Sequence, residues 1–544
     1  MSRAVSLTLL FAALTVAMAA PWSLHPASRV LVDAPDTHLF MWTLAWDAHA
    51  FATNPLGIFD ANIFHPDRNT LAYSENLIGS AFFAAPIIWL TGDLVLAMNV
   101  VAMLTCMLCG LGAYFLSRTL GLSVAAAVMA GLIFAFDPTR FFRMSQLHLT
   151  AVQWVPFGLA FMHRYFQDGR ARDLRLAMAF LVLQALTGGH GAVFLLVSMV
   201  LLTLYQLARR MPFAPIKRIR DFGIPGALLL VPAMLVWIPY RRAQVEMGLR
   251  RSLENWTVTP ESFAASPSHF HQWVVSLFTD ARVNEAASAY LFPGYLPVVL
   301  ALIAIVPAGA ARIRDRRMCF YALLALVSVL LFISPPLSLW PAVYWLPVLN
   351  FIRATSRFMI LTTLAIAVLA AYGFDRLTMK LPSRARTVAA LTAGALLLGE
   401  FSAHPFQGVD HRFEVPAIDR WLDTQPKPFV VAELPTPSPR QSGPFERHQT
   451  RAMLHSSAHW QRTIHGYSGL RSAKLDEATM ALTRFPDEDS LKALRDLGVT
   501  HVVVHSELYS PEQWTMIEGR LASIPQLQLV RIEGSGQAYR LTPR

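Results

Sequence analysis

The chain has 544 residues, of which 54% are hydrophobic and 15% are charged. Ordinary soluble domains are about 45–50% apolar and about 25% charged, so this composition excludes an ordinary soluble enzyme. The formal net charge is +11, from 46 Lys and Arg against 35 Asp and Glu. These basic residues gather in short clusters between apolar runs, which is typical of membrane orientation and argues against a nucleic-acid partner.

Twelve apolar runs follow one another along the chain as far as residue 400. The first fits a cleavable signal peptide as well as a first membrane helix, and we favour the retained helix. The remaining runs are centred near residues 85, 105, 129, 157, 182, 200, 231, 301, 327, 367 and 395.

Four connections between these runs are strongly basic and hold four, five, four and four Lys or Arg: 164–175, 209–220, 312–317 and 376–386. The positive-inside rule predicts that such connections face the cytoplasm. Twelve crossings from a cytoplasmic N-terminus would place all four outside, whereas omitting one early run places all four inside. The run 78–91 is short, contains Pro86 and lacks flanking basic residues. We therefore predict about eleven transmembrane helices and an interfacial helix at 78–91, within a long first outer loop.

The composition changes after residue 402. Residues 1–402 are the predicted transmembrane domain, and residues 403–544 are predicted to form a small extracytoplasmic α/β domain. Within this tail, 429–434 and 501–505 have the pattern of buried strands, while 489–498 and 511–524 have helical periodicity. The expected fold class is thus a polytopic α-helical membrane protein with a C-terminal α/β domain.

The first outer loop carries carboxylates immediately beyond the first apolar run. Asp33 and Asp36 precede Trp42 and Trp46, whose spacing places both rings on one face of an interfacial helix. The aspartates suit an acidic site above that helix, although Asp36 also suits a helix N-cap. Farther on, Glu75 could be a second acid or a cap for the interfacial helix. Trp42, Trp46 and Tyr73 could stack on a sugar. Anchoring at the membrane interface is the alternative for these aromatic residues.

Basic and polar residues lie at the predicted outer ends of later helices. Arg140 and His148 follow one apolar run, and His190 lies between two others. All three are candidate substrate-binding residues. Either histidine could donate to a phosphate or be structural. Arg353 and Arg357 are spaced i, i+4, which on a helix gives a shared face suited to phosphate. Snorkelling toward lipid headgroups is the alternative for these two arginines.

Taken in chain order, these motifs resemble the bacterial GT-C superfamily of integral-membrane glycosyltransferases, relatives of the protein mannosyltransferases and of transferases that modify lipid A or teichoic acid. The resemblance covers most of the chain and rests on the order of its motifs. The segments that carry it are Asp33-Ala-Pro-Asp36-Thr, Trp42 to Trp46, Phe59-Asp-Ala-Asn-Ile-Phe-His-Pro66, Ala72-Tyr-Ser-Glu-Asn76, Phe136-Asp-Pro-Thr-Arg140 with His148-Leu, Arg353-Ala-Thr-Ser-Arg357-Phe, and His465-Gly-Tyr467-Ser-Gly469.

This resemblance implies that an acidic residue of the first loop is the catalytic base and that basic groups hold a polyprenyl-phosphate sugar. Carried over, Asp36 is the base and Asp33 the second choice. Glu75 would be a second acid, ligate a divalent ion or orient the acceptor. The two aspartates are three residues apart and do not form the Asp-x-Asp pair of the family, so a requirement for a divalent cation stays open.

The expected function is transfer of a sugar from a polyprenyl-phosphate donor to a lipid, glycan or protein acceptor of the cell envelope, on the periplasmic side of a bacterial inner membrane. Two other classes remain open at this stage. A lipid or polysaccharide transporter or flippase would usually show polar groups at the bilayer midplane and two similar halves, and neither is evident. A non-catalytic envelope-assembly protein would tolerate substitution of Asp36 and Arg353.

Overall fold

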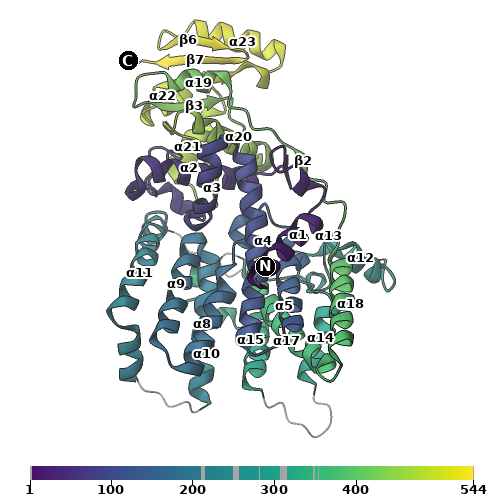
Figure 1. Ribbon diagram of the computed structural model, residues 1–544. Coiled ribbons are helices and arrows are strands. Elements are labelled where there is room, and N and C mark those ends of the chain that lie inside the picture. The colour runs from purple at the N-terminus through teal and green to yellow at the C-terminus, as the bar shows by residue number, and fades with distance from the viewer. Residues whose placement is uncertain are drawn as a thin grey trace. The chain divides into compact units, whose positions relative to one another are not determined.

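A computed structural model describes residues 3–209, 215–248, 257–280, 282–306, 315–346, 349–352 and 354–542 (Figure 1). The chain divides into two compact units. The first comprises Met1–Pro26, Asn99–Val236 and Arg250–Gly408, and the second comprises Ala27–Met98, Trp237–Leu249 and Val409–Arg544. The division at Gly408 lies close to the boundary predicted after residue 402, while the first outer loop groups with the C-terminal tail.

The described part of the first unit is helical. Its main helices are α1 (Arg3–Met18), α4 (Leu94–Thr119, whose first turn belongs to the second unit), α5 (Val124–Phe136), α8 (Trp154–Asp168), α9 (Ala171–Thr187), α10 (Gly189–Ala208), α11 (Pro215–Glu246, shared with the second unit), α14 (Tyr295–Ile305), α15 (Arg316–Phe332), α17 (Met359–Thr378) and α18 (Ser383–Phe401). Short helices connect them: α6 (Pro138–Phe141), α7 (Leu147–Thr150), α12 (His269–Ser276), α13 (Val283–Ala286) and α16 (Trp340–Val343).

Each of the twelve predicted apolar runs coincides with a helix. Within the described residues, five helices are long and apolar enough to cross a membrane: Leu94–Thr119, Val124–Phe141, Gly189–Ala208, Lys217–Glu246 and Thr355–Thr378. Three shorter helices in the described part of the chain are also apolar: α1 and α14 of the first unit, and α3 (Ile78–Thr91) of the second. The helical membrane architecture is therefore confirmed, whereas the number of crossings stays a prediction.

Helix α17 lies at the centre of the first unit, packed against α5, α14 and α15. The crossing of α14 and α17 is close because residue 373 is a glycine. A Cβ atom there would lie 1.8 Å from the Leu300 carbonyl oxygen, so a side chain at this position would force the helices apart. Small residues allow helix backbones to approach in this way where hydrophobic association is weak, as in a bilayer.

The second unit combines the first loop with the tail. The loop contributes β1 (Arg29–Val30), α2 (Pro35–Thr53) and α3. The tail contributes β2 (Val409–Asp410), α19 (Ala417–Asp423), β3 (Val430–Leu434), α20 (Ser442–His455), β4 (Arg462–Thr463), α21 (Ala473–Leu482), α22 (Glu488–Asp496), β5 (His501–His505), α23 (Pro511–Ala522), β6 (Leu527–Glu533) and β7 (Gly536–Leu541).

A five-stranded mixed sheet in the order β4-β3-β5-β7-β6 forms the core of the tail (Figure 1). Strand β3 pairs in parallel with β4 and β5, and β7 pairs antiparallel with β5 and β6. The two predicted strands are thus β3 and β5, and the α/β character predicted for the tail is present. The carboxyl ends of β3 and β5 meet at one edge of the sheet, where ligands commonly bind in α/β folds.

Candidate active site

The proposed base Asp36 lies in the first turn of α2. The helix begins at Pro35 and its N-cap is Ala34, so Asp36 is not the N-cap that the sequence allowed. A carboxylate in the first turn is still stabilised by the helix dipole. Asp36 is half-buried, and the Tyr467 hydroxyl donates a hydrogen bond to its Oδ1 atom over 3.1 Å. The carboxylate is therefore held in one orientation by a residue of the tail.

Backbone pairing between loop and tail places Tyr467 there. The amide of Thr463 donates to the carbonyl of Asn62, and the amide of Phe64 donates to the carbonyl of His465, over 2.8 and 2.9 Å. The next residue, Gly466, lies against the Phe64 ring, where a Cβ atom would approach ring carbons to 2.6 Å. The tail motif that contributed to the family resemblance thus reaches the first-loop site through a glycine that allows close contact.

Asp33, the second acidic candidate, faces two histidines. Its Oδ1 atom lies 2.9 Å from His38 Nε2 and 3.8 Å from His411 Nδ1. Burial, and next the proximity of His411, lowers the pKa of His38 to about 4, so its imidazole is neutral at pH 7. Neutral imidazole nitrogens and a carboxylate are suitable ligands for a divalent metal ion. This trio, which no sequence motif indicated, combines two first-loop residues with His411 of the tail and is where a cation beside the first-loop acids would be held.

The aromatic candidates of the loop are core residues. Trp42 is 1% exposed and stacks on Trp46, with ring centroids 6.2 Å apart. Tyr73 is also buried, and its hydroxyl donates to Asp67 Oδ2 over 3.2 Å. Their ring faces are covered by protein, so the structure does not support the idea that they stack on a sugar.

Glu75 is half-buried directly before α3. The side chain that accepts a hydrogen bond from the first amide of this helix, Ile78 N, is that of Asn76, at 3.1 Å. Asn76 in turn donates to the hydroxyl of Tyr240 over 3.3 Å. The capping role that the sequence allowed for Glu75 is therefore taken by its neighbour.

Asp47 is a buried acid that belongs to none of the sequence motifs. It is 0% exposed, and neither carboxyl oxygen has a hydrogen-bond partner among the described residues. Burial raises its pKa well above the usual range, so the carboxyl is protonated at neutral pH. Asp47 follows Asp36 by 11 residues, about three helical turns, and so lies on the same face of α2. The sequence feature that could have indicated this buried acid is an isolated Asp between apolar residues.

In the first unit, three arginines line a cavity of about 40 Å³: Arg140, Arg143 and Arg357, together with Tyr290. We call it the arginine cavity. Arg140 and Arg357 were predicted ligands, whereas Arg143 and Tyr290 were not, although Arg143 is only three residues from Arg140 in the same motif. Clustered guanidinium groups are well suited to bind phosphate oxygens.

Both predicted histidines belong to the same neighbourhood. The Arg357 guanidinium hydrogen-bonds to His190 Nε2, and the rings of His190 and His148 lie 6.3 Å apart. Burial, and next the positive charge of Arg357, lowers the pKa of His148 well below its usual value. His148 is therefore neutral at pH 7 and adds a hydrogen-bonding group without further positive charge.

Arg140 is anchored to backbone. It is 5% exposed, and its guanidinium donates to the carbonyls of Phe134 and Ala135 at the end of α5 and to Cys109 Sγ. It thus satisfies helix carbonyls that lack an intrahelical partner. Arg143 and Arg357 are better placed than Arg140 to bind an anion.

The shared helical face expected for Arg353 and Arg357 stays a prediction. Arg353 lies outside the described residues, and Ala354 is extended. Arg357 belongs to a 3₁₀ turn (Thr355–Phe358), and α17 begins only at Met359. Helix α17 thus begins two residues after Arg357.

No family model and no curated protein matches this sequence. Solved structures do resemble its fold. Arabinofuranosyltransferase AftD from Mycobacteria has a TM-score of 0.59 at 14% identity, covering 100% of this chain and 40% of its own. ArnT from Cupriavidus metallidurans bound to undecaprenyl phosphate has a TM-score of 0.50 at 13% identity. That likeness covers 99% of this chain and 100% of the ArnT chain. The Archaeoglobus fulgidus oligosaccharyltransferase complex with Zn and sulfate has a TM-score of 0.50 at 12% identity. That likeness covers 94% of this chain and 69% of the oligosaccharyltransferase chain.

This chain therefore spans well under half the length of AftD. At such low identities the likeness establishes the fold, and all three structures have the GT-C fold. The fold expected from the sequence resemblance is thus confirmed.

Proposed function

We propose that this protein is an integral-membrane glycosyltransferase that moves a sugar from a polyprenyl-phosphate donor to a lipid, glycan or protein acceptor on the periplasmic side of a bacterial inner membrane. The observation that carries the proposal is Asp36, a half-buried carboxylate oriented by the Tyr467 hydroxyl at the start of α2. Fold likeness to ArnT, solved with undecaprenyl phosphate, supports the class of donor.

Asp36 acts as the general base in this reaction. The acceptor hydroxyl oxygen attacks the anomeric carbon, its proton passes to the Asp36 carboxylate, and the bond from that carbon to the phosphate oxygen breaks. A positioned carboxylate contributes about 10²- to 10⁴-fold in such a step. Tyr467, through its 3.1 Å hydrogen bond, positions the base.

The arginine cavity stabilises the leaving group. Negative charge grows on the phosphate as the sugar departs, and preorganised cations at that point lower the barrier. Arg143 and Arg357 supply the positive charge, and His190, hydrogen-bonded to Arg357, holds that guanidinium in place.

The test uses the purified full chain and measures two quantities separately: transfer from radiolabelled undecaprenyl-phosphate hexoses and pentoses, and equilibrium binding of undecaprenyl phosphate. We expect Asp36→Asn to reduce transfer at least 100-fold and to leave binding unchanged. Arg357→Gln should weaken binding about tenfold or more. The exposed Asp496 and Arg282 supply matched controls, Asp496→Asn and Arg282→Gln, which should change neither quantity.

Two results would contradict the proposal. Undiminished transfer by Asp36→Asn would remove Asp36 as the base. Movement of the labelled donor across reconstituted vesicles without any covalent transfer would identify a transporter instead.

A further inference from the structure

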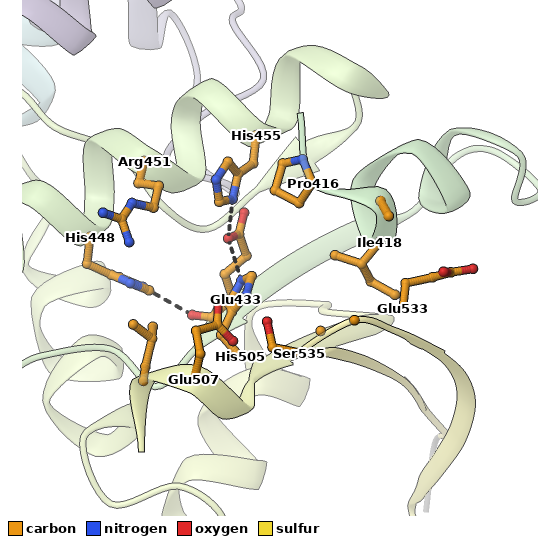
Figure 2. A pocket seen from close by; sticks show the side chains of 14 residues that line it. Pro416, Ile418, Glu433, His448, Arg451, His455, His505, Glu507, Glu533 and Ser535 are labelled. Carbon is orange, nitrogen blue, oxygen red and sulfur yellow. Dashed lines mark hydrogen bonds and ion pairs between the residues drawn. The ribbon is translucent and has the colours of Figure 1, made fainter. Parts of the chain in front are cut away.

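A buried cluster in the tail, independent of the first-loop site, centres on Glu433. Its Oε2 atom lies 2.8 Å from His455 Nδ1 and 2.9 Å from His505 Nε2 (Figure 2). Glu433 is 4% exposed, and both histidines are buried as well. One nitrogen from each imidazole and one carboxylate oxygen thus converge on a single point, and these donor atoms all lie within 4.8 Å of one another.

The fold places these three residues with little freedom. Glu433 lies near the carboxyl end of β3, and His505 is the last residue of β5, its parallel neighbour. His455 ends helix α20, which follows β3 in the chain. His448 on the same helix hydrogen-bonds to the Glu433 carbonyl at 3.2 Å and fixes α20 against the strand. Donors on such regular elements form a preorganised site.

Asp419 in α19 supplies the second observation. It is 0% exposed, and neither carboxylate oxygen has a hydrogen-bond partner in the described part of the chain. Its Oδ2 atom lies 3.9 Å from His455 Nδ1, the same nitrogen that contacts Glu433. Two buried carboxylates around one imidazole, one of them without a donor, are costly unless a further positive charge is present.

A cavity of about 380 Å³ opens beside the cluster. Glu433, His455 and His505 all line it, together with His448 and Arg451 (Figure 2). The donor atoms are therefore reachable from a space large enough to admit an ion and its water.

We propose that Glu433, His455 and His505 bind a divalent transition-metal ion, Zn²⁺ in the first place, with Asp419 as the fourth ligand. Two histidines and a carboxylate form a known zinc donor set, and a fourth oxygen completes a tetrahedron. Bonds of about 2.0 Å give separations between ligand atoms of about 3.3 Å. The two contacts of Glu433 are shorter and the contact of Asp419 is longer, so binding of the ion requires the side chains to shift, with Asp419 moving toward the other three ligands.

The chemistry of the donors also excludes other ions. Mg²⁺ and Ca²⁺ prefer sites made of oxygen ligands, whereas imidazole nitrogens favour Zn²⁺ and its first-row neighbours. The ion would tie α19, α20, β3 and β5 together, since each of these elements contributes one ligand.

The experiment measures binding of Zn²⁺ and of Co²⁺, as a spectroscopic probe, to the full chain, purified with a tag free of histidine and stripped with a chelator. We expect tight Zn²⁺ binding, visible Co²⁺ absorption typical of tetrahedral coordination, and no displacement by millimolar Mg²⁺. His505→Asn and Glu433→Gln should each remove one equivalent of bound Zn²⁺. This readout is independent of sugar transfer, so it can succeed or fail separately from the proposed function.

The controls separate this site from the trio of Asp33 and His38 in the first loop with His411 of the tail. His411→Asn should leave the equivalent of Zn²⁺ that Glu433, His455 and His505 bind in place. So should His269→Asn, which removes an exposed histidine. Because a tail variant could lose its fold, the X-ray absorption edge of Zn²⁺ bound to the His411→Asn protein provides a second measurement. Two imidazoles with oxygen ligands are expected there.

Equal Zn²⁺ stoichiometry in the wild type, His505→Asn and Glu433→Gln would overturn the proposal. An X-ray absorption spectrum of the bound Zn²⁺ that shows no imidazole ligands would also overturn it.

Discussion

Gly466 has no room for a side chain. A Cβ atom there would lie 2.6 Å from carbons of the Phe64 ring, at the point where loop and tail backbones pair. Overpacking of this kind costs about 1–3 kcal/mol. Gly466→Ala should therefore lower the thermal unfolding midpoint by several degrees and reduce transfer through displacement of Tyr467.

Gly469 provides a matched control three residues along the same segment. It is exposed, and no atom lies within 4 Å of where its Cβ would be. Gly469→Ala should leave the midpoint within about a degree of the wild type. Equal effects of the two substitutions would contradict the packing argument for Gly466.

Asp47 gives a prediction with a definite pH dependence. Its carboxyl is protonated in the folded protein because burial raises its pKa, whereas in the unfolded chain it ionises above about pH 4. Stability is therefore lost as the pH rises above that value, at up to about 1.4 kcal/mol per pH unit until the folded-state pKa is reached. Asp47→Asn should unfold at a higher temperature than the wild type at pH 8, with a smaller difference at pH 5.

Thermal unfolding in detergent between pH 5 and pH 8 measures this difference. Asp496→Asn is the control, because it makes the same substitution at an exposed position. A gap between Asp47→Asn and wild type that does not widen with pH would show that Asp47 is ionised in the folded protein.

At the scale of elements, Arg140 closes helix α5. Its guanidinium donates to carbonyls in the last turn of that helix and to Cys109 Sγ of α4. Removing a buried donor leaves its carbonyl acceptors unsatisfied, at a cost of about 1–3 kcal/mol for each buried acceptor. We expect Arg140→Gln to lower the unfolding midpoint strongly, as measured by thermal shift in detergent.

Arg143→Gln is the matched comparison, because Arg143 lines the same cavity. It should weaken binding of undecaprenyl phosphate while leaving the unfolding midpoint close to that of the wild type. The opposite pattern, with Arg140 governing binding and Arg143 governing stability, would reverse the roles assigned to the two residues.

The helices and strands could be predicted from the sequence, whereas the roles of several side chains could not. Apolar runs and strand patterns located the helices and β3 and β5, because burial imposes periodicity on the chain. The contacts that a side chain already makes within the protein could not be predicted in this way. Trp42 and Arg140 have residue types suited to a ligand site, but the first is packed and the second is bound to carbonyls. The missed Asp47 and Glu433 are single polar residues in apolar segments, and the two histidines that contact Glu433 are 22 and 72 residues away in the sequence.

At the scale of the whole molecule, the two units carry different halves of the proposed chemistry. The carboxylate and its tyrosine belong to the second unit, whereas the arginine cavity belongs to the first. Motif order suggested both halves but not that the first loop and the tail form one unit. That grouping rests on pairing between segments about 400 residues apart, such as Phe64 with His465, which no local pattern encodes.

The number of crossings decides where the proposed reaction takes place. Helix α3 has 14 residues and exposes large apolar side chains, among them Phe82 at 73% and Leu90 at 86%, as expected for a helix lying in the interface. If α3 does not cross, α4 runs inward, Arg118 lies in the cytoplasm and the four basic connectors follow it there. If α3 crosses, every later segment changes side, and the tail becomes cytoplasmic.

Reporter fusions after Gly92, after Gly121 and at residue 542 distinguish these cases. With α3 in the interface, alkaline phosphatase should be active after Gly92 and at residue 542, and a cytoplasmic fluorescent reporter should be active after Gly121. A crossing α3 predicts the reverse at all three positions. Because the positive-inside rule is satisfied four times by the first arrangement and violated four times by the second, we expect the first. The reverse pattern would place Asp36 and the tail on opposite sides of the membrane, which their 3.1 Å contact forbids.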